Sequence, residues 1–143
     1  MIQQSGVVPI HFQNAKPLFL VINNRNKTRW IVPKGVVESG HTPAESALKE
    51  AMEEAGVTGE ILLQSLGDYE YRKWDDVLDV ELFILFVAKI HENWEEQNFR
   101  ERRWINWEEF LEIVDERIPR SILERIPQLL HLTNDLNKKE KNT

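Results

Sequence analysis

The sequence of 143 residues contains no cysteine, which excludes disulfide bonds and cysteine-based metal or redox chemistry. It has no apolar run long enough to cross a membrane, and its first residues lack the charged and then apolar pattern of a signal peptide. Lys and Arg are outnumbered by Asp and Glu, 18 to 24, and the formal net charge of −6 argues against a general nucleic-acid-binding protein. We therefore expect a cytoplasmic protein with no membrane partner and no nucleic-acid partner.

The remaining composition is that of an ordinary globular protein, with 41% hydrophobic and 29% charged residues. A chain of this length can bury a core of its own, so we predict a single domain over residues 1–136. Residues 137–143, N-K-K-E-K-N-T, carry no apolar side chain, which predicts a disordered tail.

Glycine is also scarce, and two of the six glycines lie in the stretch P-K-G-V-V-E-S-G-H at 33–41. Gly35 and Gly40 suit a backbone that turns sharply or passes close to a ligand. We therefore predict a tight loop over this stretch.

A helix is predicted to begin directly after this loop. Thr42 is a good N-cap residue, Pro43 suits the first helical position, and Glu45 completes a T-x-x-E capping box. Gly56 lies where a left-handed C-terminal cap would end the helix. One face of this helix is a stripe of mostly small apolar residues that would pack closely on a sheet: Ala44, Ala47, Leu48, Ala51 and Ala55.

Three glutamates, Glu50, Glu53 and Glu54, share another face of the helix at spacings of three and four residues. Like charges at these spacings repel each other by roughly 0.2–0.5 kcal/mol per pair. A hard divalent cation such as Mg²⁺ would offset this repulsion, because it takes carboxylate oxygens and keeps positions open for water and phosphate. The alternative is a solvated acidic face on a surface helix.

The loop and the helix together resemble the Nudix box, G-x5-E-x7-R-E-U-x-E-E-x-G-U, in which U is a bulky apolar residue. His41 stands where this family has its first glutamate, and Lys49 stands where it has an arginine. Because both departures lie inside the motif, a catalytically weak or inactive nucleotide-binding or sensor module stays open as the alternative to an enzyme. The positions that match the box are Gly35, Glu50, Ala51, Glu53, Glu54, Gly56 and Val57.

The resemblance implies a Mg²⁺-dependent pyrophosphohydrolase, with Mn²⁺ as a substitute metal. Its substrate would be a nucleoside diphosphate linked to another group, foremost a nucleoside or dinucleoside polyphosphate. By resemblance, Glu50, Glu53, Glu54 and the backbone of Gly35 would hold the metal, and Glu53 or Glu50 would act in catalysis. The oligomeric state stays open, although the resemblance allows a homodimer.

Further residues are candidates on weaker grounds. The resemblance implies one more acid from the loop after the long apolar strand, and the sequence does not choose among Glu95, Glu96 and Glu101. His41 and Lys49 are possible accessory residues of the box itself. Phosphates and a stacked base would suit a set of cations and an aromatic residue near the box, for which the alternative is a solvated turn and a core ring: Arg29, Lys34, Lys73 and Tyr71.

The strand and helix patterns predict an α+β fold with a mixed β-sheet and helices on its faces, similar to the α/β/α Nudix sandwich. The last helix should begin near Pro119 and kink or break at Pro127. A further helix should follow the Asn106 N-cap and reach about residue 114. Strands are predicted at 5–13, 17–22, 28–32, 61–66, 77–90 and 102–105, and the strand at 61–66 can extend through residues 68–71.

Overall fold

The computed structural model describes residues 1–131, and the predicted tail at 137–143 lies outside these residues. No helix in this part of the chain is long and apolar enough to cross a membrane. In chain order the elements are β1 (Ile2–Gln13), β2 (Lys16–Asn23), β3 (Trp30–Ile31), β4 (Lys34–Val36), α1 (Pro43–Glu50), the π-helical turn η1 (Ala51–Ala55), β5 (Val57–Lys73), β6 (Asp76–Ile90), β7 (Arg102–Ile105), α2 (Trp107–Ile113) and α3 (Arg120–Leu123).

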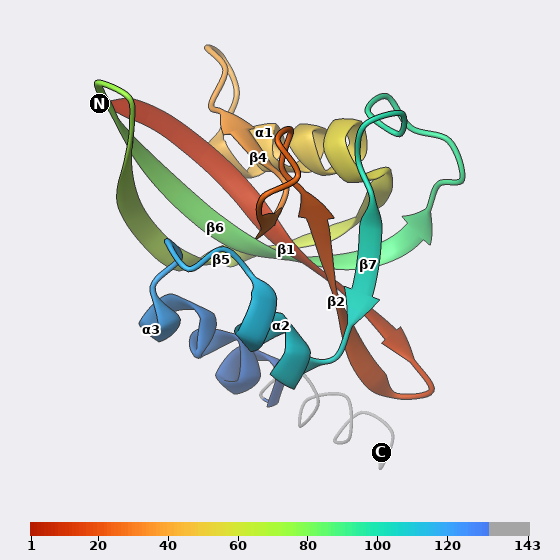
Figure 1. Cartoon of the computed structure of the whole chain (residues 1–143). Coiled ribbons are helices and arrows are strands. Elements are labelled where there is room, and N and C mark those ends of the chain that lie inside the picture. Colours follow the sequence, from red (N-terminus) through yellow and green to blue (C-terminus); the bar gives the residue numbers. More distant parts are fainter. Residues whose placement is uncertain (132–143) are drawn as a thin grey trace.

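Seven strands form one mixed sheet, which confirms the predicted α+β class. The main order is β3-β2-β1-β6-β5, with β4 paired to β1 and β7 paired to β2. The pair β1–β6 is parallel and the other pairs are antiparallel. Figure 1 shows α1 on one side of this sheet and α2 and α3 on the other.

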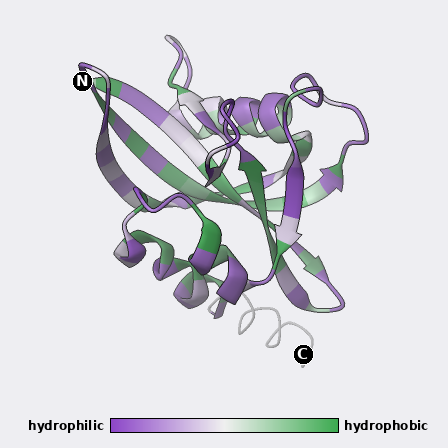
Figure 2. Ribbon diagram, in the orientation of Figure 1, coloured by the Kyte–Doolittle hydropathy of each residue, from purple (hydrophilic) through white to green (hydrophobic). Residues whose placement is uncertain are grey.

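Both faces of the sheet are buried, because successive strand residues point to opposite sides. Val7 packs under α1 and its neighbour Val8 packs under α2 and α3. Leu82 and Phe83 divide in the same way on β6. In Figure 2 the strands are accordingly rich in hydrophobic colour at the centre, while loops and outer helix faces are hydrophilic.

The helix at the centre of the box has the predicted start. The Thr42 side chain accepts from the Glu45 N–H, and the Glu45 carboxylate accepts from the Thr42 N–H. The predicted stripe is also confirmed, because Ala47, Ala51 and Ala55 are fully buried against the sheet. The last turn differs from the prediction, since Ala51–Ala55 is π-helical rather than α-helical before Gly56 ends it at φ 64°.

Two predictions around the box are wrong in detail. Residues 33–41 are not all loop, because Lys34–Val36 forms β4 and pairs with β1. The third strand is Trp30–Ile31 rather than 28–32, because the Asn24 side chain draws the N–H groups of Thr28 and Arg29 into a closed turn. Propensity alone does not show such a turn, since it depends on one side chain folding back over four residues.

The C-terminal half follows the sequence pattern more closely. The strand at 102–105 and the helix capped by Asn106 are confirmed. The strand predicted at 61–66 is part of a longer strand, Val57–Lys73, whose register shifts between Leu62 and Gly67. The last helix is interrupted at Glu124, just before Pro127, because a proline ring clashes with the carbonyl four residues earlier.

Candidate active site

Two of the three box glutamates meet beside Gly35. A Cβ atom on Gly35 would lie 2.8 Å from Cγ of Glu50 and closer still to its carboxylate, so any larger residue there would displace the Glu50 side chain. The neighbouring N–H of Lys34 points to Oε1 of Glu54 at 3.4 Å. Strand β4 therefore holds both carboxylates against its backbone, at the C-terminal end of α1 and in η1.

The environment of Glu54 disfavours its charged form. Burial, foremost, and the hydrogen-bonded carboxyl of Glu50 together raise the pKa of Glu54 to about 9, against the opposing charge of Arg100. Burial likewise raises the pKa of Glu50. A buried and a half-buried carboxyl in contact favour either a retained proton or a cation between them.

Glu53 has its own charged contact, with Lys49. Its Oε1 is 3.7 Å from Nζ of Lys49, and its side chain is 31% exposed. Lys49 also donates to Oε1 of Glu38, and His41 Nδ1 lies 4.0 Å from Oε2 of the same carboxylate. Both departures from the box, His41 and Lys49, are thus neighbours of Glu38, which supplies an acid three residues before the position where the family has one.

The residues that would bind Mg²⁺ are present, although they do not form a closed cage. Within residues 1–131, no three His, Cys, Asp or Glu side chains are grouped in a way that would hold a metal ion on their own. Mg²⁺ is commonly bound by one or two carboxylates and completes its shell with waters and substrate phosphates. Glu50 and Glu54 fit that mode, because a divalent ion would replace the proton that their contact favours.

The loop after β6 brings one candidate acid to the site. Oε1 of Glu96 accepts from Nε of Arg100 at 3.0 Å, and NH2 of Arg100 lies 3.9 Å from Oε1 of Glu54. Glu101 contributes only its backbone N–H, which donates to Asn23 Oδ1, and its side chain is exposed. The structure therefore places Glu96, and not Glu101, near the box carboxylates.

A pocket of about 490 Å³ is lined by Glu54 and by the four predicted substrate-binding residues. Within residues 1–131, Glu54 is the only acidic residue that lines it. Seven Lys and Arg residues of this part of the chain line the same pocket, so cations are concentrated here although the chain is acidic overall. These seven are Arg25, Arg29, Lys34, Arg72, Lys73, Arg100 and Arg117.

Tyr71 lies between two of these cations. Nζ of Lys34 donates to the Tyr71 hydroxyl at 2.7 Å, and that hydroxyl donates to Oε1 of Gln4 at 3.2 Å. Nζ of Lys34 and Cζ of Arg117 are each 4.5 Å from the centre of the Tyr71 ring. Burial, foremost, and the nearby charge of Arg117 together lower the pKa of Lys34 to about 8. An anion in the pocket would favour the charged form of Lys34.

Sequence reasoning missed Gln4, Arg100 and Arg117 as parts of this pocket. No local motif surrounds them, and they come from β1, the loop after β6 and the segment after α2. Arg100 shows the only sequence signal, since it follows Glu96 by four residues. That spacing is common on any helical surface, so it does not indicate a site.

Arg117 is held in place by a buried carboxylate, which leads to a stability prediction. Asp115 is 4% exposed and accepts from Arg117 Nε at 3.0 Å and NH2 at 2.8 Å. Burial alone would raise the pKa of Asp115, but the hydrogen bonds and charge of Arg117 outweigh it and lower the pKa below its usual range. The pair therefore stabilises the fold above about pH 4, the ordinary value for aspartate, and is lost as the pH falls through the lowered pKa.

We expect Asp115→Asn to reduce the free energy of unfolding at pH 7 by about 1–3 kcal/mol, because it weakens a buried charged hydrogen bond. The loss should shrink as the pH falls below about 4, because the wild-type carboxyl becomes protonated as the pH passes through its lowered pKa. Urea unfolding between pH 7 and pH 3 measures this, with the exposed Asp75→Asn as the control. An equal loss at every pH would contradict the role assigned to the ion pair.

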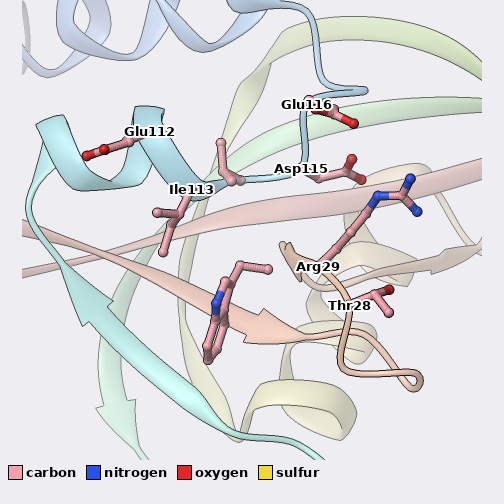
Figure 3. A pocket seen from close by; sticks show the side chains of 8 residues that line it. Thr28, Arg29, Glu112, Ile113, Asp115 and Glu116 are labelled. Carbon is pink, nitrogen blue, oxygen red and sulfur yellow. The ribbon is translucent and has the colours of Figure 1, made fainter.

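A second cavity, of about 450 Å³, lies on the other side of the turn that carries Thr28 and Arg29. Figure 3 shows Glu112 and Ile113 of α2 on one side of it and Asp115 and Glu116 on another. None of the box glutamates lines this cavity, and three carboxylates do. It is therefore a poor site for phosphate.

Comparison with known proteins identifies the family of this chain. The model of the NUDIX domain matches residues 3–126. The chain belongs to the Nudix family. Residues 35–57 match its Nudix box, in which Glu50 and Glu54 meet beside Gly35.

Several Nudix relatives are similar over much of the chain. Nudix hydrolase 13, mitochondrial, of Arabidopsis thaliana is 33% identical over 138 residues, which cover 90% of this chain and 68% of that protein. Nudix hydrolase 4 of the same plant is 34% identical, over 81% of this chain and 56% of its own length. Diphosphoinositol polyphosphate phosphohydrolase 3-beta of Bos taurus is also 34% identical, over 68% and 59%. The chain spans half to about two thirds of the length of such relatives.

Solved structures share the Nudix fold. A binary complex of the Ap4A hydrolase of C. elegans superposes with a TM-score of 0.74 at 21% identity, covering 92% of this chain and 98% of that one. The NUDIX domain of Shewanella oneidensis NrtR, complexed with ADP ribose, has a TM-score of 0.70 at 12% identity, covering 91% and 88%. At these identities the likeness establishes the fold alone.

Proposed function

We propose that this protein is a Mg²⁺-dependent pyrophosphohydrolase that cleaves a phosphoanhydride bond in a nucleoside or dinucleoside polyphosphate. The observation that carries the proposal is the single pocket that joins Glu54 to seven cationic side chains. A chain of phosphates fits such a pocket, because Arg and Lys donate strong charge-assisted hydrogen bonds to phosphate oxygens. Its anhydride bonds would then lie next to the box carboxylates.

Each box residue has a distinct part in this proposal. Glu50, Glu53, Glu54 and the carbonyl of Gly35 would hold the metal, which when bound neutralises phosphate charge and acidifies a water. Glu53 is partly exposed, so water reaches it, and it would also accept the proton of the water that attacks phosphorus. The bridging P–O bond breaks, and the pocket's cations stabilise the charge on the departing phosphate.

The names of relatives support a phosphate-rich substrate. A diphosphoinositol polyphosphate phosphohydrolase is among the sequence relatives, and an Ap4A hydrolase is among the structural ones. Both names describe compounds with several phosphates in a small volume. Tyr71, fixed by Lys34 and Gln4, offers a ring that would lie beside the non-phosphate part of the substrate.

The second candidate function is a nucleotide-binding module with little or no turnover. It is favoured by Lys49, which replaces the planar guanidinium of arginine with a point charge, and by His41, which removes an acid from the box loop. The compensating acid, Glu38, is 44% exposed in its side chain, and ion pairs this exposed contribute little. In this second function, the pocket would bind a nucleotide as a signal.

Release of phosphate or nucleotide with Mg²⁺ and with Mn²⁺ distinguishes the two functions. The substrates to compare are dinucleoside polyphosphates, nucleoside triphosphates, ADP-sugars and diphosphoinositol polyphosphates. We expect turnover of a phosphate-rich class that EDTA abolishes and added metal restores. Tight ligand binding without hydrolysis under either metal would contradict the enzyme and favour the binding module.

A further inference from the structure

The end of the box helix needs partners from outside the helix. The N–H of Gly56 bonds to the carbonyls of both Ala51 and Met52, so the helix closes with a π-type turn. The carbonyls of the next residues, Glu53 to Gly56, have no partner within the helix, as at every helix C-terminus. Two of these residues, Glu53 and Glu54, also carry candidate metal-binding side chains. Whatever holds their carbonyls therefore also sets the direction of their side chains.

One segment of the chain, residues 91–102, supplies all of these partners. The N–H of Glu96 donates to the carbonyl of Glu53 at 3.1 Å, and the N–H of His91 donates to the carbonyl of Gly56 at 2.8 Å. Nε1 of Trp94 donates to the carbonyl of Glu54 at 3.0 Å. NH1 of Arg102 donates to the carbonyl of Ala55 at 3.1 Å. In Figure 1 this segment runs beside the end of α1 before it enters β7.

Trp94 and Arg102 form the rigid part of this cap. Cζ of Arg102 lies 3.8 Å from the centre of a Trp94 ring, and its NH1 also bonds to the carbonyl of His91 at 2.8 Å. The indole is packed on Gly56, where a Cβ would lie 2.8 Å from Cβ and Cγ of Trp94. A stacked guanidinium and an indole keep their positions better than two flexible side chains would.

We propose that Trp94 and Arg102 are positioning residues of the active site. Trp94 holds the backbone carbonyl of Glu54 directly, and Arg102 supports it by stacking on Trp94 and by bonding the next carbonyl, that of Ala55. The same segment carries Glu96 and Arg100, so it also brings a further acid and a cation to Glu54. Segment 91–102 therefore contacts Glu54 in two ways, through its backbone carbonyl and through its side-chain carboxylate. The expected effect on kcat rests on the proposed function. The expected effect on metal affinity is a separate claim, which can be tested without a substrate.

Trp94→Phe isolates the contact, because phenylalanine keeps a ring against Gly56 and Arg102 but has no N–H for the Glu54 carbonyl. We expect Mn²⁺ affinity, measured without substrate, and kcat each to fall about 10-fold, within the about 10- to 100-fold range found when supports of metal ligands are removed. KM should stay within about twofold, because the cationic pocket is untouched. Arg102→Lys should lower Mn²⁺ affinity and kcat in the same direction. The fold-loss in the double variant should be smaller than the product of the two single fold-losses.

Two substitutions elsewhere serve as matched controls. Trp107→Phe removes an indole N–H on α2, on the opposite side of the sheet, and Arg103→Lys alters an exposed arginine paired with Glu109. Both should leave Mn²⁺ affinity and kcat unchanged. The melting temperature of every variant is recorded, so that a general loss of fold is recognised.

The outcomes separate the inference from the proposed function. If Trp94→Phe lowers the melting temperature but leaves Mn²⁺ affinity and kcat at the wild-type level, the two residues only stabilise the fold and the inference is overturned. A wild-type protein that binds Mn²⁺ but hydrolyses no substrate overturns the proposed function, and the Mn²⁺ affinities of the variants still decide the positioning role. A wild-type protein that binds no Mn²⁺ overturns both.

Discussion

Glu53→Gln should lower kcat by about 10²–10⁴-fold, the usual effect of losing a general base. Glu53 has one charged neighbour at 3.7 Å, Lys49, and its side chain is partly exposed. Its removal therefore leaves no buried group without a partner. We expect the melting temperature to change little, so that the loss is one of chemistry rather than of folding. Steady-state kinetics at saturating Mg²⁺ together with thermal unfolding measure both effects.

The control for this variant is Glu60→Gln, which alters an exposed carboxylate on β5. It should keep full activity. If Glu53→Gln retains metal-dependent turnover close to the wild-type rate, Glu53 is not the base. Glu50 would then be the next carboxylate to test, since the family resemblance implies either residue.

Gly35→Ala should reduce activity by about 10²-fold, because a misplacement of about 1 Å at reacting groups has this effect. The added methyl group would occupy the position of the Glu50 side chain, since Cγ of Glu50 is 2.8 Å from where the new Cβ would be. Ordinary carbon contacts are about 3.5–4.0 Å. Glu50 must therefore move away from Glu54, and Mn²⁺ affinity should fall together with kcat.

Gly40→Ala is the matched control for this prediction. Gly40 has φ +83°, so alanine there is strained by about 1–2 kcal/mol, but a Cβ meets nothing within 4 Å. It should destabilise the protein without changing the metal affinity of the folded state. Equal kinetic losses in the two variants would show that loop strain, and not the Glu50 contact, accounts for the effect at Gly35.

Much of the fold was predictable because its signals are local. The capping box at Thr42 and Glu45 depends on backbone geometry within one helical turn. The apolar run of β6 indicates a strand buried inside the sheet, whatever strand lies alongside it. The helix break before Pro127 needs only the proline ring and the carbonyl four residues earlier.

The predictions of secondary structure were wrong where a contact with a distant residue, or with one side chain, changed the local backbone conformation. Lys34–Val36 lies in a stretch with glycine and polar residues, and it forms a strand because β1 offers unpaired backbone groups beside it. The π-helical turn at Ala51–Ala55 has no sequence signature of its own, and it occurs where segment 91–102 takes up the last carbonyls of the helix.

The sequence by itself determined the candidate carboxylates, because their spacing along one helix places them on one face before any packing is considered. Only the tertiary structure decided which acid and which cations join them. Lys34, Tyr71 and Arg117 meet because β4 and β6 flank β1, β5 pairs with β6, and the segment after α2 returns to Trp30. Strand register and chain return depend on contacts between distant residues, and no local pattern encodes their distances.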